Sequence, residues 1–377
     1  MPVEFIGMIF HRSDSELKSF RYDGEVDPEF LKTFARAHED GGFDRVLVGY
    51  GSSGPDGWTL ATWAAAATER LGFLLAHRPG FVVPTLAARK AATIDQLTGG
   101  RLALHIVTGG SDTEQQRDGD FLDHHARYRR TDEYIDVLRK VWASDQPFDH
   151  GGEFYRFKGA FSTVRPADPS RIPIYLGGSS EAALRVGARQ ADVWASWGEP
   201  VEAVRSQIAK VREAASELGR APRFSVSVRP IMAATEEKAW QRAYGILARV
   251  QGLSAARPAP RRQNSGSLRL LEFAAQGDVL DKRLFTAIAR ANGADGNSTA
   301  LVGTPDQVAE SLLDYYDAGA TTLLIRGFDP LQDAIDYGRD LLPLVHAEVA
   351  KRDREQERAK ATRPAEGVRP HPPSHQT

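Results

Sequence analysis

The chain has 377 residues, of which 41% are hydrophobic and 26% charged, the balance of a globular protein with a substantial core. Its 48 Lys and Arg nearly balance its 50 Asp and Glu, which argues against a nucleic-acid or membrane-surface binder. Cysteine is absent, so disulfides, Cys-ligated metals and thiol nucleophiles are excluded. The sequence shows neither a transmembrane run nor the basic, apolar start of a signal peptide, so we expect a cytoplasmic protein.

Short β-rich runs alternate with helical patterns along the chain. The apolar runs predict strands at residues 5–10, 46–50, 71–76, 102–107, 172–176, 193–197, 224–232 and 322–325. Helical patterns fill most of the gaps, at residues 27–38, 58–69, 85–97, 128–143, 180–188, 201–218, 305–318 and 331–345. This alternation predicts an α/β fold, a (β/α)8 TIM barrel forming a single domain over residues 1–350. A doubly wound open sheet is the alternative, but no Gly-rich dinucleotide-binding turn follows the first strand.

Two segments depart from the alternation. The connection between strands seven and eight is far longer than a barrel helix requires, and residues 252–267 are rich in Ala, Pro, Arg, Ser and Gly. Loops that follow barrel strands form the active face, so we expect a mobile, lid-like insertion over about residues 234–300, with an inert insertion as the alternative. The charged, Pro-rich segment 351–377 has no apolar periodicity and predicts a disordered, flexible C-terminal tail.

The fifth predicted strand runs into Gly177-Gly178-Ser179-Ser180, directly before a helical pattern. Glycines allow the backbone to approach a ligand closely, and the start of a helix offers unpaired N–H groups and the positive end of a dipole. This pattern indicates a phosphate site. An ordinary Ser N-cap on a tight turn is the alternative interpretation.

Three arginines lie at predicted strand ends, Arg78 after the third strand, Arg229 on the seventh and Arg326 on the eighth, with His11 after the first. Together at one barrel mouth they would form a pocket for carboxylate, phosphate or sulfonate oxygens. Pairing of each arginine with a neighbouring carboxylate is the alternative. The spacing of histidines and carboxylates matches no usual metal site, and no P-loop or Gly-x-Ser-x-Gly elbow occurs, so we predict no metal.

Several motifs resemble one family. The segment AARKAATIDQLTGGR at residues 87–101 is similar to the helix–strand passage of the bacterial-luciferase-like flavin monooxygenases. The similarity covers about residues 3–348, is weakest at 250–290, and continues in order through residues 106–110, 119–124, 127–128, 177–180 and 197–200. Within that superfamily the chain is most similar to the FMNH2-dependent alkanesulfonate monooxygenases.

The resemblance implies a two-component enzyme. A separate NAD(P)H-dependent FMN reductase would supply FMNH2, and this chain would use it with O2 to cleave the C–S bond of an organosulfonate to an aldehyde and sulfite. A homodimer or homotetramer is implied by the pairing of barrel relatives. By the same resemblance, Tyr128, Ser179 and Ser180 would bind the flavin phosphate, Thr108 would lie beside the isoalloxazine, and the cofactor-binding set would be completed by His77, His124 and Gly178.

For the sulfonate, the resemblance points to Trp197, Arg229, Arg290 in the lid and Arg78, and the candidate catalytic residues are His11, Arg229 and Arg326. The sequence also departs from the family. Its seventh strand reads Ser227-Val228-Arg229 where relatives carry Arg-x-His. At three further positions, where the family has a tyrosine, a cysteine and an asparagine, this chain has Phe328, Gly54 and His105, respectively.

These departures remove two candidate proton carriers, and Arg229 cannot act as a base at neutral pH although it can hold a sulfonate. Gly54 suggests a roomier pocket, so we hypothesise a larger or more polar substrate such as the sulfosugar sulfoquinovose. The alternatives are oxygenation of dimethylsulfone, another luciferase-like reaction such as deazaflavin-dependent hydride transfer, and a non-catalytic flavin-binding relative.

Overall fold

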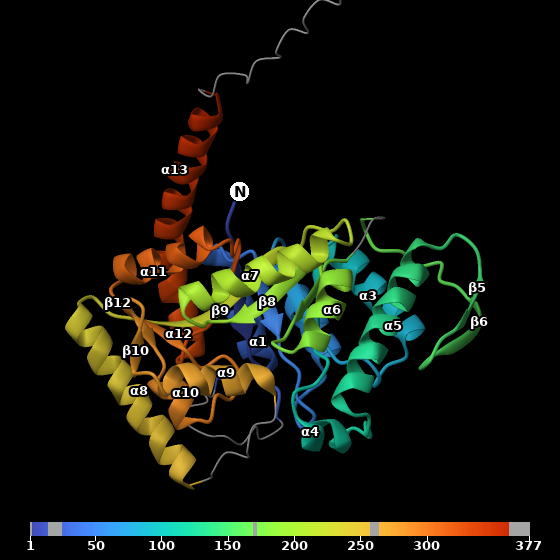
Figure 1. The fold of residues 1–377 in the computed structure, drawn as a ribbon, viewed down its shortest axis with the longest axis horizontal. Helices are drawn as coiled ribbons and strands as arrows, with labels where there is room; N and C mark the ends of the chain where they lie inside the picture. The colour runs from blue at the N-terminus through green and yellow to red at the C-terminus, as the bar shows by residue number, and fades with distance from the viewer. Residues whose placement is uncertain (1, 14–24, 169–171, 257–263, 362–377) are drawn as a thin grey trace, which may run out of the picture.

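The structure, a computed structural model, describes residues 2–13, 25–168, 172–256 and 264–361 (Figure 1). Its centre is a closed barrel of parallel strands, each paired with the next, in the order β1 (Glu4–Ile9), β2 (Arg45–Val48), β3 (Gly72–His77), β4 (Leu102–Ile106), β7 (Ile174–Gly177), β8 (Val193–Trp197), β9 (Arg223–Met232) and β13 (Thr322–Ile325). Because β13 also pairs with β1, the sheet closes. The predicted TIM-barrel-like fold is confirmed, and the open sheet is excluded.

Helices follow the strands and cover the outside of the barrel. They are α1 (Pro28–Asp40), α2 (Gly57–Ala65), α3 (Pro84–Thr98), α4 (Asp112–Arg117), α5 (His124–Ala143), α6 (Glu181–Gln190), α7 (Val201–Ser216), α11 (Pro305–Asp317), α12 (Pro330–Asp336) and the π-helix η1 (Tyr337–Leu341). A hairpin of β5 (Phe148–Gly151) and β6 (Arg156–Ala160) lies outside the barrel beside α5 (Figure 1).

Several helices begin where the sequence supplies a capping side chain. The Asp27 carboxylate accepts hydrogen bonds from the N–H groups of Glu29 and Phe30 at the start of α1. At the start of α11, Thr304 and Gln307 form a capping box, each side chain accepting from the other's backbone N–H. Such caps satisfy the N–H groups that have no partner within the helix, which fixes where these helices start.

Side chains along each strand alternate between two cores. On β4, Leu104 and Ile106 face outward into the main core between barrel and helices. Ala103 faces inward, and the same alternation puts His105 on the inward face. The buried inner core is formed by Ile6, Leu74, Ala103, Tyr175, Val193 and Leu324.

A polar cluster closes the barrel at the amino-terminal end of its strands. Glu4 forms ion pairs with Arg45 at 2.8 Å and with Arg223 at 3.2 Å. It also accepts hydrogen bonds from the hydroxyls of Tyr175 and Thr322. This polar cluster occupies one end of the barrel, and TIM-barrel enzymes place their active sites at the other end, at the carboxyl ends of the strands.

The insertion between β9 and β13 is a folded unit. The second half of β9 leaves the barrel and pairs with β12 (Ala300–Gly303). In turn, β12 pairs antiparallel with β11 (Leu284–Phe285), and β11 pairs antiparallel with β10 (Val279–Leu280). The helices α8 (Glu236–Ala256), α9 (Ser265–Ala274) and α10 (Ala287–Ala291) belong to the same unit, which gathers at one side of the barrel (Figure 1). A separate core holds it together, including Ile231, Phe285, Ile288, Val302 and Phe328.

Two predictions differ from the structure. The expected loop at residues 252–267 is in part helical, because α8 continues through Ala256 and α9 begins at Ser265, while 257–263 lie outside the described residues. The final helix, α13 (Leu342–Ala361), projects from the body (Figure 1) and extends into the segment expected to be a flexible tail, the rest of which, 362–377, also lies outside the described residues. None of the described helices is both long and apolar enough to cross a membrane.

Candidate active site at the carboxyl ends of the barrel strands

Four of the predicted flavin-binding residues meet between β4, β7, α5 and α6. The Tyr128 hydroxyl lies near the side chains of Ser180 and Thr108, and both of them influence its pKa. A Cβ atom on Gly178 would lie 2.9 Å from the Tyr128 hydroxyl and 2.6 Å from Cβ of Ala183, so this position requires glycine. We call Thr108, Tyr128, Gly178 and Ser180 the Tyr128 cluster.

The Tyr128 cluster lies at the start of α6. Ser180 is the N-cap of that helix, and its hydroxyl accepts the N–H of Ala183 at 3.1 Å. Burial raises the pKa of Tyr128, while Ser180 and the charge of Arg127 lower that pKa to a smaller extent, so the phenol stays protonated at neutral pH. Hydroxyl donors and the N–H groups of a helix start are thus presented together, and Ser179 beside them is partly exposed.

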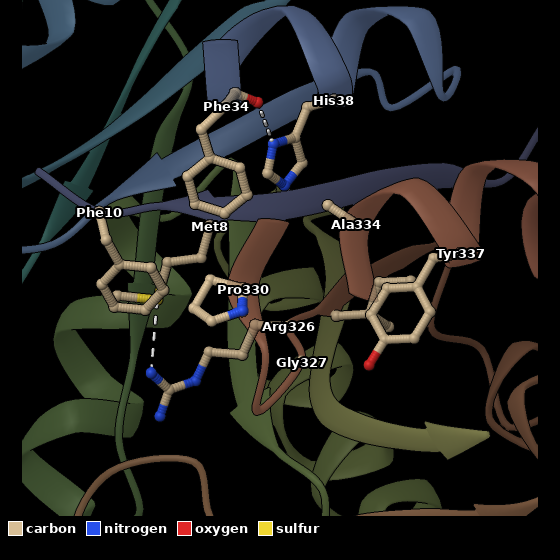
Figure 2. A pocket seen from close by; sticks show the side chains of 10 residues that line it. Met8, Phe10, Phe34, His38, Arg326, Gly327, Pro330, Ala334 and Tyr337 are labelled. Carbon is tan, nitrogen blue, oxygen red and sulfur yellow. Dashed lines mark hydrogen bonds between the residues drawn. The ribbon is translucent and has the colours of Figure 1, made fainter. Parts of the chain in front are cut away.

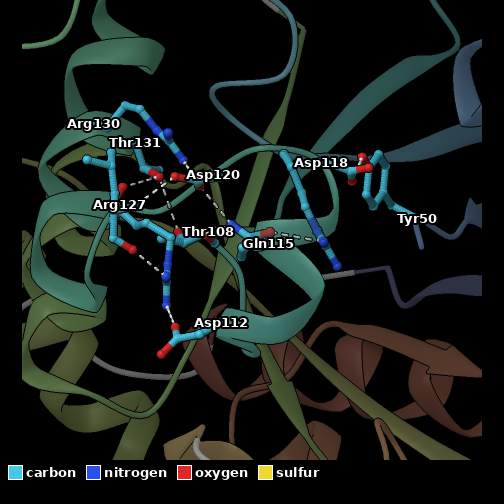
Figure 3. A network of polar contacts seen from close by, with 11 residues as sticks. Tyr50, Thr108, Asp112, Gln115, Asp118, Asp120, Arg127, Arg130 and Thr131 are labelled. Carbon is cyan, nitrogen blue, oxygen red and sulfur yellow. Dashed lines mark hydrogen bonds and ion pairs between the residues drawn. The ribbon is translucent and has the colours of Figure 1, made fainter. Parts of the chain in front are cut away.

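Contacts of Thr131 and Arg127 surround the Tyr128 cluster (Figure 3). The Thr131 hydroxyl lies 2.8 Å from the Arg127 carbonyl oxygen and 3.3 Å from the Thr108 hydroxyl. The buried Arg127 guanidinium pairs with Asp112 at 2.8 Å and donates to the Leu122 carbonyl at 2.6 Å. These contacts connect α4, α5 and the end of β4.

Arg78 contacts the same elements through side chains of α4. Its guanidinium pairs with Glu114 at 2.7 Å and donates to the Gln115 side chain at 2.9 Å, and it stacks 4.5 Å above the Tyr50 ring. Gln115 in turn donates to the Asp120 carboxylate and the Thr108 carbonyl. Glu114 already neutralises Arg78, so the predicted role in sulfonate binding does not fit its contacts.

The structure does not bring His77 to the cluster. Adjacent residues of β3 point to opposite sides, and His77 faces the helix layer, where its Nε2 lies 2.6 Å from the Tyr134 hydroxyl and its ring packs edge-on against Trp58. Burial lowers the pKa of His77 to about 3, so the ring is neutral. His77 therefore lies apart from the Tyr128 cluster, while exposed His124 lies edge-on to Tyr128 with ring centroids 5.0 Å apart.

Arg229 is also placed differently from its prediction as a catalytic and sulfonate-binding residue. It lies where β9 leaves the barrel, and its side chain is buried between the barrel and the insertion. Its guanidinium stacks 3.4 Å above the Phe328 ring and donates to the Gly327 carbonyl at 2.8 Å. These contacts assign Arg229 to the attachment of the insertion.

Arg290 does not converge with Trp197. It lies on α10 with half of its side chain exposed, pairs with Asp278 and donates to the Ala274 carbonyl at 2.9 Å. These partners belong to the insertion itself, so the expected sulfonate contact from the lid is not seen at this residue.

The insertion does cover part of the barrel mouth. Trp197, at the end of β8, packs against a small apolar cluster of the insertion formed by Leu270, Ala289 and Ala294, and a Cβ on Gly266 would lie 3.0 Å from the Trp197 ring. Across the mouth, a Cβ on Gly110, shortly after β4, would lie 3.3 Å from Cβ of Asn264, the N-cap of α9. The first turn of α9 therefore lies over the mouth between the ends of β8 and β4.

An ion pair attaches α9 to the barrel. Arg269 pairs with both oxygens of the buried Glu199 carboxylate, at 2.9 and 2.5 Å. The Glu199 carbonyl accepts from the Tyr315 hydroxyl of α11 at 2.7 Å. This pair was not predicted, because the two residues are far apart in the sequence and no local motif joins them.

Of the three catalytic candidates, His11 and Arg326 lie at the mouth. His11 is buried, and burial together with the charge of Arg12 lowers its pKa. Arg326 is partly exposed, donates to the Asn297 carbonyl at 3.3 Å and lies 3.7 Å from the Met8 sulfur, beside a small cavity shown in Figure 2. Asn297 also donates to the Ser227 hydroxyl at 2.7 Å, a contact for which the sequence carries no signal.

Comparisons with known proteins agree with this architecture. The model of the family described as luciferase-like monooxygenase matches residues 3–322. The fold is similar to that of the EDTA monooxygenase from Chelativorans sp. BNC1, with 19% identity, a TM-score of 0.73, and 92% of this chain and 94% of that chain covered.

Two further structures show the range of cofactors. The oxygenating constituent of 3,6-diketocamphane monooxygenase from Pseudomonas putida, solved with FMN, has 18% identity and a TM-score of 0.67 over 91% of this chain and 98% of that chain. The coenzyme F420-dependent tetrahydromethanopterin reductase from Methanopyrus kandleri has 17% identity and a TM-score of 0.69 over 91% and 99%. Such neighbours do not single out the alkanesulfonate monooxygenases, whereas the family match covers most of the sequence. The chain therefore belongs to the luciferase-like monooxygenase family.

Proposed function

We propose that this chain is the oxygenase component of a two-component system that receives FMNH2 from a separate NAD(P)H-dependent FMN reductase. The observation that carries the proposal is the Tyr128 cluster at the start of α6. FMN ends in a phosphate dianion, which suits the hydroxyls of Tyr128, Ser179 and Ser180, the N–H groups of the helix start and the space that Gly178 leaves without a Cβ.

The chemistry would be divided between cofactor and protein. Bound reduced flavin supplies the two electrons that activate O2. The protein holds the phosphate at the Tyr128 cluster, and Trp197 with the first turn of α9 restricts the entry of water. His11, neutral at pH 7 because its pKa is lowered, is the candidate for holding a proton at the mouth.

The substrate that we propose is an organosulfonate, in particular a polar one such as sulfoquinovose. One oxygen atom of O2 would enter the aldehyde product and the other would leave as water, while the broken C–S bond releases sulfite. Arg326, directly after β13 and bonded to the Asn297 carbonyl, takes the place that the sequence assigned to Arg229 as the cation for the sulfonate.

A second candidate is oxygenation of a neutral substrate such as dimethylsulfone. The observation that favours it is that protein groups already engage three of the arginines expected to bind an anion. Arg78 pairs with Glu114, Arg290 pairs with Asp278, and Arg229 stacks on Phe328. A neutral substrate would need none of these cations.

Sulfite release separates the two candidates. Purified protein would be assayed with a flavin reductase, FMN, NADH and O2 against short and long alkanesulfonates, sulfoquinovose and dimethylsulfone. We expect sulfite from a sulfonate and a KM raised at least about tenfold in Arg326→Met, since a charge-assisted hydrogen bond is lost. Arg290→Met is the matched control and should leave KM unchanged. Oxidation of dimethylsulfone without sulfite from any sulfonate would contradict the proposed substrate.

A further inference from the structure

Arg326 begins a short loop, residues 326–329, that connects β13 to α12. We call it the Arg326 loop. Asp333 of α12 is buried, and its Oδ2 accepts the backbone N–H groups of Phe328 at 2.8 Å and of Asp329 at 2.9 Å. The backbone of the Arg326 loop is therefore bonded to a buried carboxylate of the helix that follows.

Two further contacts fix the middle of the Arg326 loop. A Cβ on Gly327 would lie 2.1 Å from the Asp333 side chain, so only glycine lets this carboxylate approach the loop so closely. The Arg229 guanidinium donates to the Gly327 carbonyl at 2.8 Å and stacks 3.4 Å above the Phe328 ring. Arg229 and Phe328 are each only 2% exposed, so these contacts are shielded from solvent.

A cation of the insertion orients the Asp333 carboxylate. Arg242 of α8 pairs with Asp333 Oδ1 at 2.5 Å, while Oδ2 accepts the two N–H groups of the Arg326 loop. Arg242 also donates to the carbonyl of Met232, the last residue of β9, at 3.3 Å. The ion pair of Arg242 and Asp333 therefore links the insertion to the loop that begins with Arg326.

The far end of the Arg326 side chain is held as well, because its guanidinium donates to the Asn297 carbonyl at 3.3 Å. With its backbone and its guanidinium both bonded, Arg326 is ordered before a ligand arrives, and an ordered side chain loses less conformational entropy on binding. A buried ion pair often contributes no more stability than well-packed apolar side chains would. This comparison favours a role of Arg242 and Asp333 in positioning.

We propose that Asp333 is a positioning residue for Arg326, and that Arg242 keeps the Asp333 carboxylate in the orientation that this requires. The inference rests on the proposed function, under which Arg326 binds the sulfonate. Positioning of Arg326 strengthens sulfonate binding and takes no part in the reaction of reduced flavin with O2. The KM for the sulfonate therefore depends on Asp333 and Arg242, whereas kcat and the affinity for FMNH2 do not.

Steady-state assays with flavin reductase, FMN, NADH and O2 test the inference, with sulfoquinovose and 1-octanesulfonate as the sulfonates. We expect Arg242→Leu to raise KM about three- to tenfold, with kcat within about twofold of the wild type. Arg242→Gln retains a donor for Asp333 and should restore KM to within about twofold. Arg283→Leu is the matched control, because Arg283 also pairs with a carboxylate of α8, Glu236 at 2.7 Å, and donates to the Val302 carbonyl. It should leave KM unchanged.

A double-mutant cycle distinguishes positioning from a general loss of structure. If Asp333 acts through Arg326, Asp333→Asn should raise KM at least about threefold in the wild type and change it less than about twofold in Arg326→Met. An equal effect of Asp333→Asn in both backgrounds would overturn the inference while leaving the proposed function intact. Unchanged KM in Arg242→Leu would do the same.

If Asp333→Asn does not fold, hydrogen exchange in Arg242→Leu supplies the second measurement. The amides of Phe328 and Asp329 should exchange faster than in the wild type, and those of Arg283→Leu should not. Unchanged exchange of these two amides in Arg242→Leu overturns the inference. Failure of the wild type to release sulfite from either sulfonate would instead contradict the proposed function, and the inference would fall with it.

Discussion

Desolvation lowers the pKa of three histidines, which makes stability depend on pH at the scale of single residues. Burial lowers the pKa of His38 to about 4, of His77 to about 3 and of His105 to about 4. In the unfolded chain each titrates near pH 6.5. Between the folded and the unfolded pKa values, the unfolded chain binds more protons than the folded chain. The contribution of these neutral histidines to the free energy of unfolding is therefore complete above about pH 6.5 and is lost as the pH falls toward their folded pKa values.

We therefore expect the free energy of unfolding to decrease between pH 6.5 and pH 4, each histidine contributing at most about 1.4 kcal/mol per pH unit. Urea denaturation across this range measures the slope. His77→Gln removes one such group, so its slope should be shallower whatever its absolute stability, whereas exposed His125→Gln should keep the wild-type slope. Identical slopes for all three proteins would contradict the assignment of His77 as a buried neutral ring.

Ser180 should have two separable effects because it caps α6 and belongs to the Tyr128 cluster. We expect Ser180→Ala to lower the free energy of unfolding by about 1 kcal/mol and to weaken FMNH2 binding severalfold. Thr304→Ala removes the cap of α11 instead, so it should cost similar stability without changing the affinity. Calorimetric titration and urea denaturation of both variants measure the two effects, and equal affinities would argue against the cluster as the phosphate site.

Residues differ in how far the sequence could predict their places. The Gly178–Ser180 turn was predictable because strand, glycines, hydroxyls and helix are contiguous in the chain. The position of Arg229 was not, because it depends on β9 continuing beyond the barrel to pair with β12 and on Phe328 lying beneath its guanidinium. The outward direction of His77 follows from the alternation of β3, because two adjacent strand residues cannot both face the interior.

At the scale of elements, α9 is the helix that connects the insertion to the mouth. It is held by Arg269 on the buried Glu199 and by contacts of its first turn with Trp197. Removing Arg269 leaves the Glu199 carboxylate buried without its cation, which is costly, so α9 should detach more often.

We expect Arg269→Ala to increase amide hydrogen exchange throughout α9 and to raise the KM for the organic substrate, while barrel strands keep their protection. Arg290→Ala breaks an exposed pair within the insertion and is the control, with an effect below about 1 kcal/mol. Hydrogen-exchange mass spectrometry distinguishes the variants. Unchanged exchange in α9 of Arg269→Ala would show that the ion pair does not hold the helix.

Long regular elements were predictable, and short ones were not. All eight barrel strands follow apolar runs in the sequence, whereas β10 and β11 have two residues each and carry no periodicity. Residues 252–256 have the composition of a loop but form the last turn of α8, because the packing of Val250 and Ile246 on the insertion core stabilises the helix.

At the scale of the whole molecule, the two ends of the barrel have separate tasks. The Glu4 ion pairs close one end, and the Tyr128 cluster, Arg326 and His105 gather toward the other. We therefore expect the charges of Glu4, Arg45 and Arg223 to affect the free energy of unfolding but not ligand binding, as residues at this end do in other TIM barrels.

Glu4→Gln tests this separation. We expect a loss of about 1–3 kcal/mol in the free energy of unfolding, because Arg45 and Arg223 lose their carboxylate, and an unchanged affinity for FMNH2. Glu29→Gln, which breaks an exposed pair with Lys32, should have little effect on either quantity. A weaker FMNH2 affinity in a folded Glu4→Gln protein would show that the two ends are coupled.

The central claim is that the chain binds reduced flavin through the phosphate at the Tyr128 cluster. Its most direct test is an anaerobic titration of the wild type with FMNH2 and with reduced riboflavin, which differ only in that phosphate. The account predicts FMNH2 to bind at least about tenfold more tightly, since charge-assisted hydrogen bonds to the phosphate are lost with riboflavin. Equal affinities for the two flavins would contradict it.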